Sequence, residues 1–180
     1  MLDIRQVKHA PRAARAEGTP AERMGRVRRF NLLAGELPVE QERPGYAWRA
    51  RRGLGGEFGL QWLGASVYEL PDGQWTFPYH YHHGVEEWLY VVSGAPTLRD
   101  PSGERALSPG DIVGFPSGPD GAHSVRGPGR VVMFSGVAAG GTPSVSVYPD
   151  SDKLGTRPPG GGPDLLNFPR RDAVDYWDGE

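Results

Sequence analysis

Short apolar runs separated by clusters of glycine and proline constrain this chain more than any other feature. From about residue 58 onward, apolar and polar residues alternate, and turn sequences recur roughly every 8–12 residues. The turns are Pro71-Asp72-Gly73, Ser93-Gly94, Pro101-Ser102-Gly103, Ser108-Pro109-Gly110 and Gly127-Pro128-Gly129. No helical period intervenes between these turns, so the pattern predicts an all-β sandwich or barrel of short strands.

The 180 residues are enough for one domain with arms at its ends. Regular alternation is absent before about residue 57 and ends near residue 148. We therefore expect an irregular N-terminal arm at 1–56, a barrel at 57–148 and a C-terminal extension at 149–180. The strands are expected at roughly 58–70, 75–83, 86–92, 95–99, 104–107, 111–115, 122–126, 130–137 and 144–148.

Composition excludes several classes of function. The chain has no cysteine, which removes disulfides, thiolate metal ligands and cysteine nucleophiles. A formal net charge of -2 and the lack of a helix-turn-helix pattern argue against a nucleic-acid partner. No apolar run approaches the roughly 20 residues of a membrane span, and the N-terminus lacks a signal-peptide core. We therefore expect a cytoplasmic protein without a membrane partner.

Residues with metal-ligating side chains gather in the segment Tyr79-His80-Tyr81-His82-His83-Gly84-Val85-Glu86-Glu87. Alternate residues of a strand point to the same face, so His80 and His82 are expected to project together. By the same parity, His83 points to the opposite face and Glu86 points to solvent. Imidazole and carboxylate are the ligand set of a borderline divalent metal, so the spacing indicates a metal site.

The order of these residues resembles the two motifs of the cupin superfamily. The first motif, G-x5-H-x-H-x(3,4)-E-x6-G, is matched at His80, His82, Glu87 and Gly94. The second, G-x5-P-x-G-x2-H-x3-N, is matched at Gly110, Pro116, Gly118 and His123, with an insert of two residues before the histidine. The resemblance covers roughly residues 58–137. As a whole, the chain resembles small, stand-alone bacterial cupins of unassigned activity.

The resemblance implies a fold and a ligand set. The implied fold is the double-stranded β-helix, a jelly-roll barrel, with irregular N- and C-terminal arms. The implied ligands are His80, His82, Glu87 and His123, which would hold one divalent metal ion per chain: Fe, Mn, Ni, Cu or Zn. Three histidines and one carboxylate leave one or two coordination positions open, as a catalytic site requires. His83 is then expected at the rim of the site and not among the ligands.

The function expected from this site is a small metal-dependent enzyme, of dioxygenase, isomerase or tailoring type, that acts on a small organic substrate. No catalytic residue beyond the ligands can be named. Leu89, Val91 and Val125 share strand faces with the ligands and are the candidates for lining the substrate pocket. The alternative is a non-catalytic, metal-dependent protein that binds or senses a small molecule, because a fold does not determine a function.

The arms predict self-association. Single-barrel proteins that resemble this one commonly pair their barrels, and the arms carry large aromatic side chains that a partner would bury. These are Phe30, Trp48, Tyr176 and Trp177. We therefore expect a homodimer.

Overall fold

The computed structural model describes residues 27–136, 142–159 and 162–180. These residues form thirteen strands, one short α-helix and three 3-10 turns. The strands are β1 (Val39–Arg43), β2 (Tyr46–Arg51), β3 (Gly64–Leu70), β4 (Tyr81–His83), β5 (Glu87–Gly94), β6 (Thr97–Asp100), β7 (Gly103–Ala106), β8 (Ile112–Phe115), β9 (Ser124–Arg126), β10 (Gly129–Ser135), β11 (Ser144–Tyr148), β12 (Lys153–Arg157) and β13 (Asn167–Pro169). The helix is α1 (Leu54–Glu57), and the 3-10 turns are η1 (Pro119–Gly121), η2 (Pro149–Ser151) and η3 (Arg170–Asp172).

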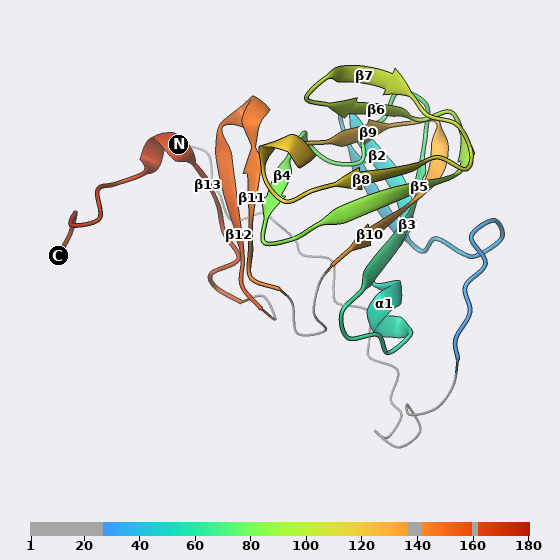
Figure 1. Cartoon of the computed structure of the whole chain (residues 1–180), viewed down its shortest axis with the longest axis horizontal. Coiled ribbons are helices and arrows are strands. Elements are labelled where there is room, and N and C mark those ends of the chain that lie inside the picture. The colour runs from blue at the N-terminus through green and yellow to red at the C-terminus, as the bar shows by residue number, and fades with distance from the viewer. Residues whose placement is uncertain (1–26, 137–141, 160–161) are drawn as a thin grey trace.

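The strands form three antiparallel sheets. The largest has the order β1-β2-β3-β10-β5-β8, and a three-stranded sheet with the order β7-β6-β9 faces it (Figure 1). Some neighbours in the large sheet are far apart in sequence, because β10 lies between β3 and β5. Crossed connections between two facing sheets make the all-β fold a jelly-roll, double-stranded β-helix, as the sequence predicts.

The main core lies between these two sheets. On β5, Leu89 and Val91 point inward and are fully buried, and they lie beside Met133 and Val131 of β10. Leu98 of β6 closes the core from the facing sheet. Each such side chain contributes about 1.5–3 kcal/mol when it is removed from water. The alternating pattern of β5 therefore sets which residues face inward, and Glu87 shares that face.

A second, smaller core covers the outer face of the large sheet. Val67 of β3 and Val132 of β10 are buried there under Leu37 and Leu54. The chain before β3 thus wraps over the sheet, and both faces of β3 and β10 are apolar for this reason. A strand that is buried on both sides has a continuous apolar run. In β10 this run is Val131-Val132-Met133-Phe134.

The chain before residue 57 is more regular than we expected. Residues 1–26 of the predicted arm lie outside the described residues, but β1 and β2 form a hairpin that extends the large sheet through β3. Both strands carry charged residues on an exposed face. These residues obscure the alternation of apolar and polar residues by which a strand is recognised in the sequence. Trp48 is only 6% exposed and packs in the main core, so it needs no partner subunit to bury it.

The segment 75–83 is a strand only at its end. Trp75 and His80 each form a single bridge, to Arg126 and His123, and continuous pairing begins at β4. Pro78 explains the interruption, because a proline has no N–H to donate to a ladder. The expected strand at 58–70 is likewise shortened, since α1 and a turn precede β3.

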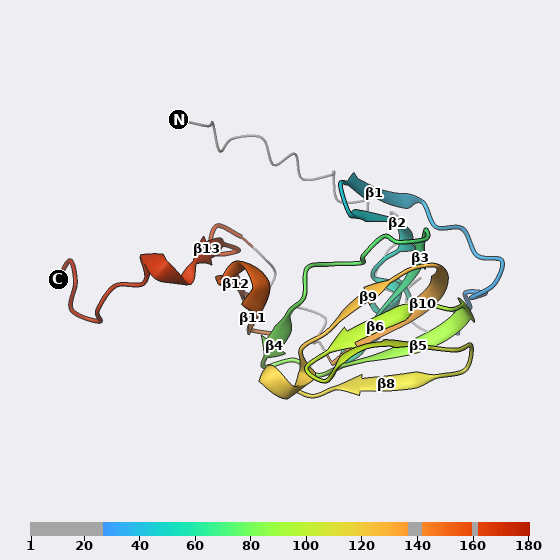
Figure 2. The ribbon, with the colours of Figure 1, turned by 90° about the horizontal axis from the view of Figure 1, so that it is seen from above.

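The C-terminal extension continues a third sheet. This four-stranded sheet has the order β13-β12-β11-β4 and stands at one side of the barrel, with the C-terminus extending away from it (Figures 1 and 2). Only β4 belongs to the first half of the chain, so this sheet joins residues 81–83 to residues 144–169. Over the described ranges, no helix is long and apolar enough to cross a membrane.

Candidate metal centre

A single antiparallel bridge brings His80 to His123. The His123 N–H donates to the His80 carbonyl at 2.8 Å, and the His80 N–H donates to the His123 carbonyl at 3.1 Å. Residues paired in this way place their side chains on the same face, and the two ring centroids lie 4.9 Å apart. The main chain therefore sets the distance between two histidines that are distant in sequence.

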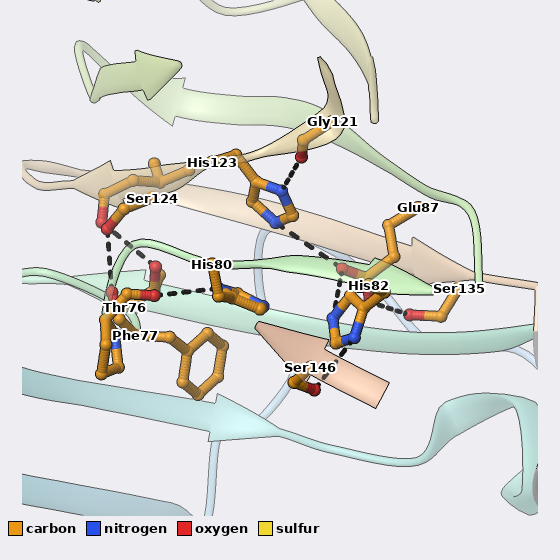
Figure 3. Close-up of polar contacts among 12 residues, drawn as sticks. Thr76, Phe77, His80, His82, Glu87, Gly121, His123, Ser124, Ser135 and Ser146 are labelled. Carbon is orange, nitrogen blue, oxygen red and sulfur yellow. Dashed lines mark hydrogen bonds and ion pairs between the residues drawn. The ribbon is translucent and has the colours of Figure 1, made fainter. Parts of the chain in front are cut away.

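His82 and Glu87 come from β4 and β5, which lie in different sheets, and their side chains meet those of His80 and His123 (Figure 3). His82 lies in β4, with its ring centroid 4.8 Å from that of His80. Glu87 is the first residue of β5, and its Oε2 atom lies 3.3 Å from Nε2 of His82 and 3.6 Å from Nε2 of His123. Donor atoms of His80, Glu87 and His123 all lie within 4.8 Å of one another. His82 is not part of this group of three, and it contacts the group through Oε2 of Glu87.

Each histidine is held by an oxygen at Nδ1. His80 donates to the Pro78 carbonyl at 2.9 Å, and His123 donates to the Gly121 carbonyl at 2.8 Å. A carbonyl can only accept, so Nδ1 carries the proton in both rings and Nε2 has a free lone pair. Nδ1 of His82 lies 3.1 Å from Oγ of Ser146. This is the arrangement that orients imidazoles as metal ligands.

The carboxylate is held in the same way. The Ser135 hydroxyl on β10 donates to Oε1 of Glu87 at 2.6 Å, which leaves Oε2 facing the histidines. Burial alone would raise the pKa of Glu87. The hydrogen bond and electrostatic attraction of His82, helped by Ser135, instead lower this pKa to about 2. The carboxyl group is therefore ionised at neutral pH.

Burial keeps two imidazoles neutral. It lowers the pKa of His80 to about 3, and the neighbouring His123 and His82 add to the effect. Burial also lowers the pKa of His123. Neutral imidazoles and an ionised carboxylate are the protonation states that bind a metal. With no thiolate in the chain, this donor set fits a borderline divalent ion such as Fe, Mn, Ni, Cu or Zn.

Aromatic rings enclose the histidines. Phe115 stacks on His123 with a centroid distance of 3.7 Å and an interplanar angle of 11°. Tyr148 of β11 stacks on His80 at 5.8 Å, and Phe77 meets the same ring edge-on at 6.4 Å. His80 and His123 are 8% and 3% exposed, and His82, which packs edge-on against His80, is 9% exposed. The rings are thus held in place by packing as well as by hydrogen bonds.

The other residues considered from the sequence lie elsewhere. His83 is exposed on the opposite face of β4, against Tyr81, and lines a surface hollow of about 550 Å³ at the end of β11 and β12. Glu86 is exposed. The pocket candidates Leu89, Val91 and Val125 have exposed fractions of 0%, 0% and 1% and pack in the main core. Their role in lining a substrate pocket stays a prediction.

Sequence reasoning missed the residues that support the ligands. Ser135, Ser146 and Tyr148 lie on β10 and β11, outside both motifs, and Phe115 was considered only as part of a strand. The insert before His123 carries a signal that we did not use: it forms η1, whose Gly121 carbonyl accepts from His123. The lengthened turn therefore supplies the group that orients its own histidine.

Comparison with known proteins agrees with the fold. Residues 66–136 match a family model described as a cupin domain. A proposed sugar phosphate isomerase of Acidithiobacillus ferrooxidans is 26% identical, with a TM-score of 0.63, over 75% of this chain and 86% of that one. A sugar phosphate isomerase of the cupin superfamily from Silicibacter pomeroyi is 23% identical, with a TM-score of 0.64, over 81% of this chain and 95% of that one. No curated protein matches the sequence.

Proposed function

We propose that this chain, in which residues 66–136 match a cupin domain, is a metal-dependent enzyme acting on a small organic substrate. His80, His82, Glu87 and His123 would hold one divalent ion. The single observation that carries the proposal is the tethering of the donor set: Nδ1 of His80 and His123 is hydrogen-bonded outward, while Nε2 and the carboxylate converge.

An isomerase is the reaction type that we favour among those considered. The relative from Acidithiobacillus ferrooxidans is a proposed sugar phosphate isomerase, and it aligns with three quarters of this chain. When bound, a divalent ion supplies Lewis acidity towards a substrate oxygen. The chain's own residues would hold the site dry and rigid, since Phe77, Phe115 and Tyr148 pack on the imidazoles.

The test of the metal begins with protein purified without an affinity tag. Elemental analysis is expected to find about one divalent ion per chain in the wild type and in His83→Ala, and little in His82→Ala. His83 is the matched control because it adjoins His82 but leaves β4 on the other face. Retention of the ion in His82→Ala together with its loss in His83→Ala would refute the assignment of ligands.

The test of the reaction follows on the metal-loaded protein. Aldose and ketose phosphates in D₂O are expected to exchange a carbon-bound hydrogen and interconvert, which proton NMR detects. Oxygen uptake by the Fe(II) form tests the dioxygenase alternative on the same sample. Turnover in either assay that disappears in His82→Ala supports an enzyme, and the assay that responds identifies the reaction type.

A second candidate is a metal-dependent binding or sensing protein without turnover. The closure of the site favours it: His80, His82 and His123 are 8%, 9% and 3% exposed, and the Glu87 side chain is 14% exposed. A binding protein would take up a ligand in calorimetry but leave every substrate unchanged. An enzyme would convert it.

We also propose a homodimer. Tyr176 and Trp177 are 84% and 72% exposed on the C-terminal segment, where a partner would bury them. Phe30 packs against the outer core of its own chain and does not contribute to this argument. Light scattering at micromolar concentration is expected to give the dimer mass, and a monomer would overturn the proposal.

A further inference from the structure

One face of the four-stranded sheet looks toward the metal centre. Ser146 on β11 lies directly opposite His82 on β4, and its hydroxyl contacts that ring (Figure 3). Residues opposite one another in antiparallel strands share a face, so Gly155 on β12, which pairs with Ser146, lies on it too. We call this the site face. It carries His82, Ser144, Ser146, Tyr148, Lys153, Gly155, Arg157 and Asn167.

Two cationic side chains lie on the site face, on either side of Gly155. Nε of Arg157 lies 3.2 Å from Oγ of Ser146, which in turn contacts His82. Nζ of Lys153 lies 5.2 Å from the centre of the Tyr148 ring, and that ring stacks on His80. Each cation is therefore separated from a histidine of the centre by a single side chain.

The two cationic groups are closer together than their positions in β12 suggest. Residues 153 and 157 are separated by about 13 Å along a strand. Arg157, however, turns back along β12 to reach Ser146, which lies opposite Gly155, while Lys153 stays over Tyr148. The cationic groups thus occupy neighbouring rows of the sheet, roughly 7 Å apart along the strand. That spacing suits one small anionic group.

Lys153 and Arg157 differ in their ion pairing from the other Lys and Arg residues that follow residue 53. Eight Lys and Arg residues follow residue 53, and six of them form an ion pair with a carboxylate: Arg99, Arg105, Arg126, Arg130, Arg170 and Arg171. The two that have no carboxylate partner among the described residues are Lys153 and Arg157. Both lie on the face that looks toward the candidate metal centre, where a negative ligand would complete the pairing.

We propose that the site face binds an oxyanion of the substrate, a phosphate monoester or a carboxylate. This inference rests on the proposed function and names its substrate class: a small anionic molecule whose other end reaches the metal centre. A guanidinium offers two parallel N–H donors to an oxyanion, and an ammonium adds a point charge. Between the two cations, Asn167 of β13 lies opposite Gly155, and its Oδ1 lies 2.5 Å from the position that a Cβ on Gly155 would take, so a side chain at residue 155 would fill this space.

The test is a calorimetric titration of metal-loaded protein with inorganic phosphate and, separately, with acetate. Arg157→Gln is expected to weaken phosphate binding about tenfold or more, and Lys153→Gln several-fold, because each removes a charge-assisted contact. Arg171→Gln is the matched control: it removes the same charge from a side chain that is 80% exposed and paired with Asp172. Metal content is measured in every sample, so that loss of metal is not mistaken for loss of anion binding.

Three results would overturn the inference. Wild-type protein that binds neither anion excludes it, and so does equal weakening in Arg157→Gln and Arg171→Gln. Full phosphate affinity in Arg157→Gln would mean that phosphate contacts the metal alone. If the wild type carries no metal, the proposed function fails, but the same titration on metal-free protein still decides the inference. The cations are positioned by Ser146 and Tyr148, not by an ion.

Discussion

His80 and His123 are joined by two main-chain hydrogen bonds, one in each direction, so the two imidazoles face each other before any ion arrives. This main-chain bridge fixes the two Cα positions, and both rings are further held through Nδ1. Half of the proposed ligand set is therefore preorganised. Binding of an ion would then stabilise the fold without having to assemble the site.

Removal of the ion is expected to lower the thermal stability of the wild type and to leave His82→Ala unchanged. An ion that binds only the folded chain, at about 100 times its dissociation constant, stabilises by about 2.7 kcal/mol. Thermal unfolding with and without excess chelator measures the difference. A chelator effect of the same size in both proteins would place the ion away from His82.

Acid is expected to destabilise the metal-free protein. The unfolded chain protonates a histidine below about pH 6.5, whereas the pKa of His80 in the fold is about 3. The unfolded state therefore binds more protons between these values, and the free energy of unfolding falls as the pH falls through this window. Glu87 acts in the same direction from its ordinary value of 4.5 down to about 2.

Urea unfolding of the metal-free protein at about pH 7.5 and about pH 5 measures this slope. Replacement of His80 by glutamine is expected to make the dependence on pH shallower, because the buried imidazole is gone. His83→Gln is the control, since that side chain is exposed, and it is expected to keep the slope of the wild type. A slope unchanged in His80→Gln would contradict the prediction.

The proposed ligands could be predicted from the sequence because their positions follow local rules. His80 and His82 are two residues apart, and Glu87 lies in the next strand, so strand parity and motif spacing suffice. The supporting residues do not follow such rules. Ser146 contacts His82 only because β11 pairs with β4, and Ser135 contacts Glu87 only because β10 pairs with β5. Pairings between distant strands carry little local signal.

The first hairpin was missed for a different reason. Pro44-Gly45 is a turn sequence, and Gly45 has a φ of +79°, as a tight turn between β1 and β2 requires. The flanking strands are polar on their exposed faces, which masked the alternation. The turn chemistry was therefore the better signal, and periodicity alone was not enough there.

Gly94 is expected to be intolerant of alanine because of its surroundings. Its φ is +83°, and a Cβ would lie 2.5 Å from Cα of Gly129 on the paired strand β10. Gly45 has nearly the same φ of +79° but has nothing within 4 Å of such a Cβ. Gly45→Ala is expected to cost about 1–2 kcal/mol for the backbone conformation alone. Gly94→Ala is expected to cost about 1–3 kcal/mol more, since the strands must separate.

Urea unfolding of the two alanine variants at neutral pH measures this difference. The comparison isolates the close approach of β5 and β10, because the backbone strain is nearly the same in both. Equal losses of stability would show that the strands part easily at Gly94. The glycine of the first motif would then be explained by its dihedral angle alone.

Ser146→Ala is expected to weaken metal binding while leaving all four proposed ligands in place. Oγ of Ser146 is fully buried, 3.1 Å from Nδ1 of His82 and 3.2 Å from Nε of Arg157. When His82 binds an ion through Nε2, its Nδ1–H needs an acceptor, and Ser146 is the one the fold provides. Loss of such an outer hydrogen bond typically lowers metal affinity about 10–100-fold.

Competition with a chelating dye measures the dissociation constant of the ion in each variant. Ser144→Ala is the matched control, because Ser144 lies two residues earlier on the same strand face, opposite Arg157 and not His82. Its affinity is expected to equal that of the wild type, and Ser146→Thr is expected to recover part of the loss by restoring the hydroxyl. An unchanged dissociation constant in Ser146→Ala would mean that packing against His80 alone orients His82, since the two ring centroids lie only 4.8 Å apart.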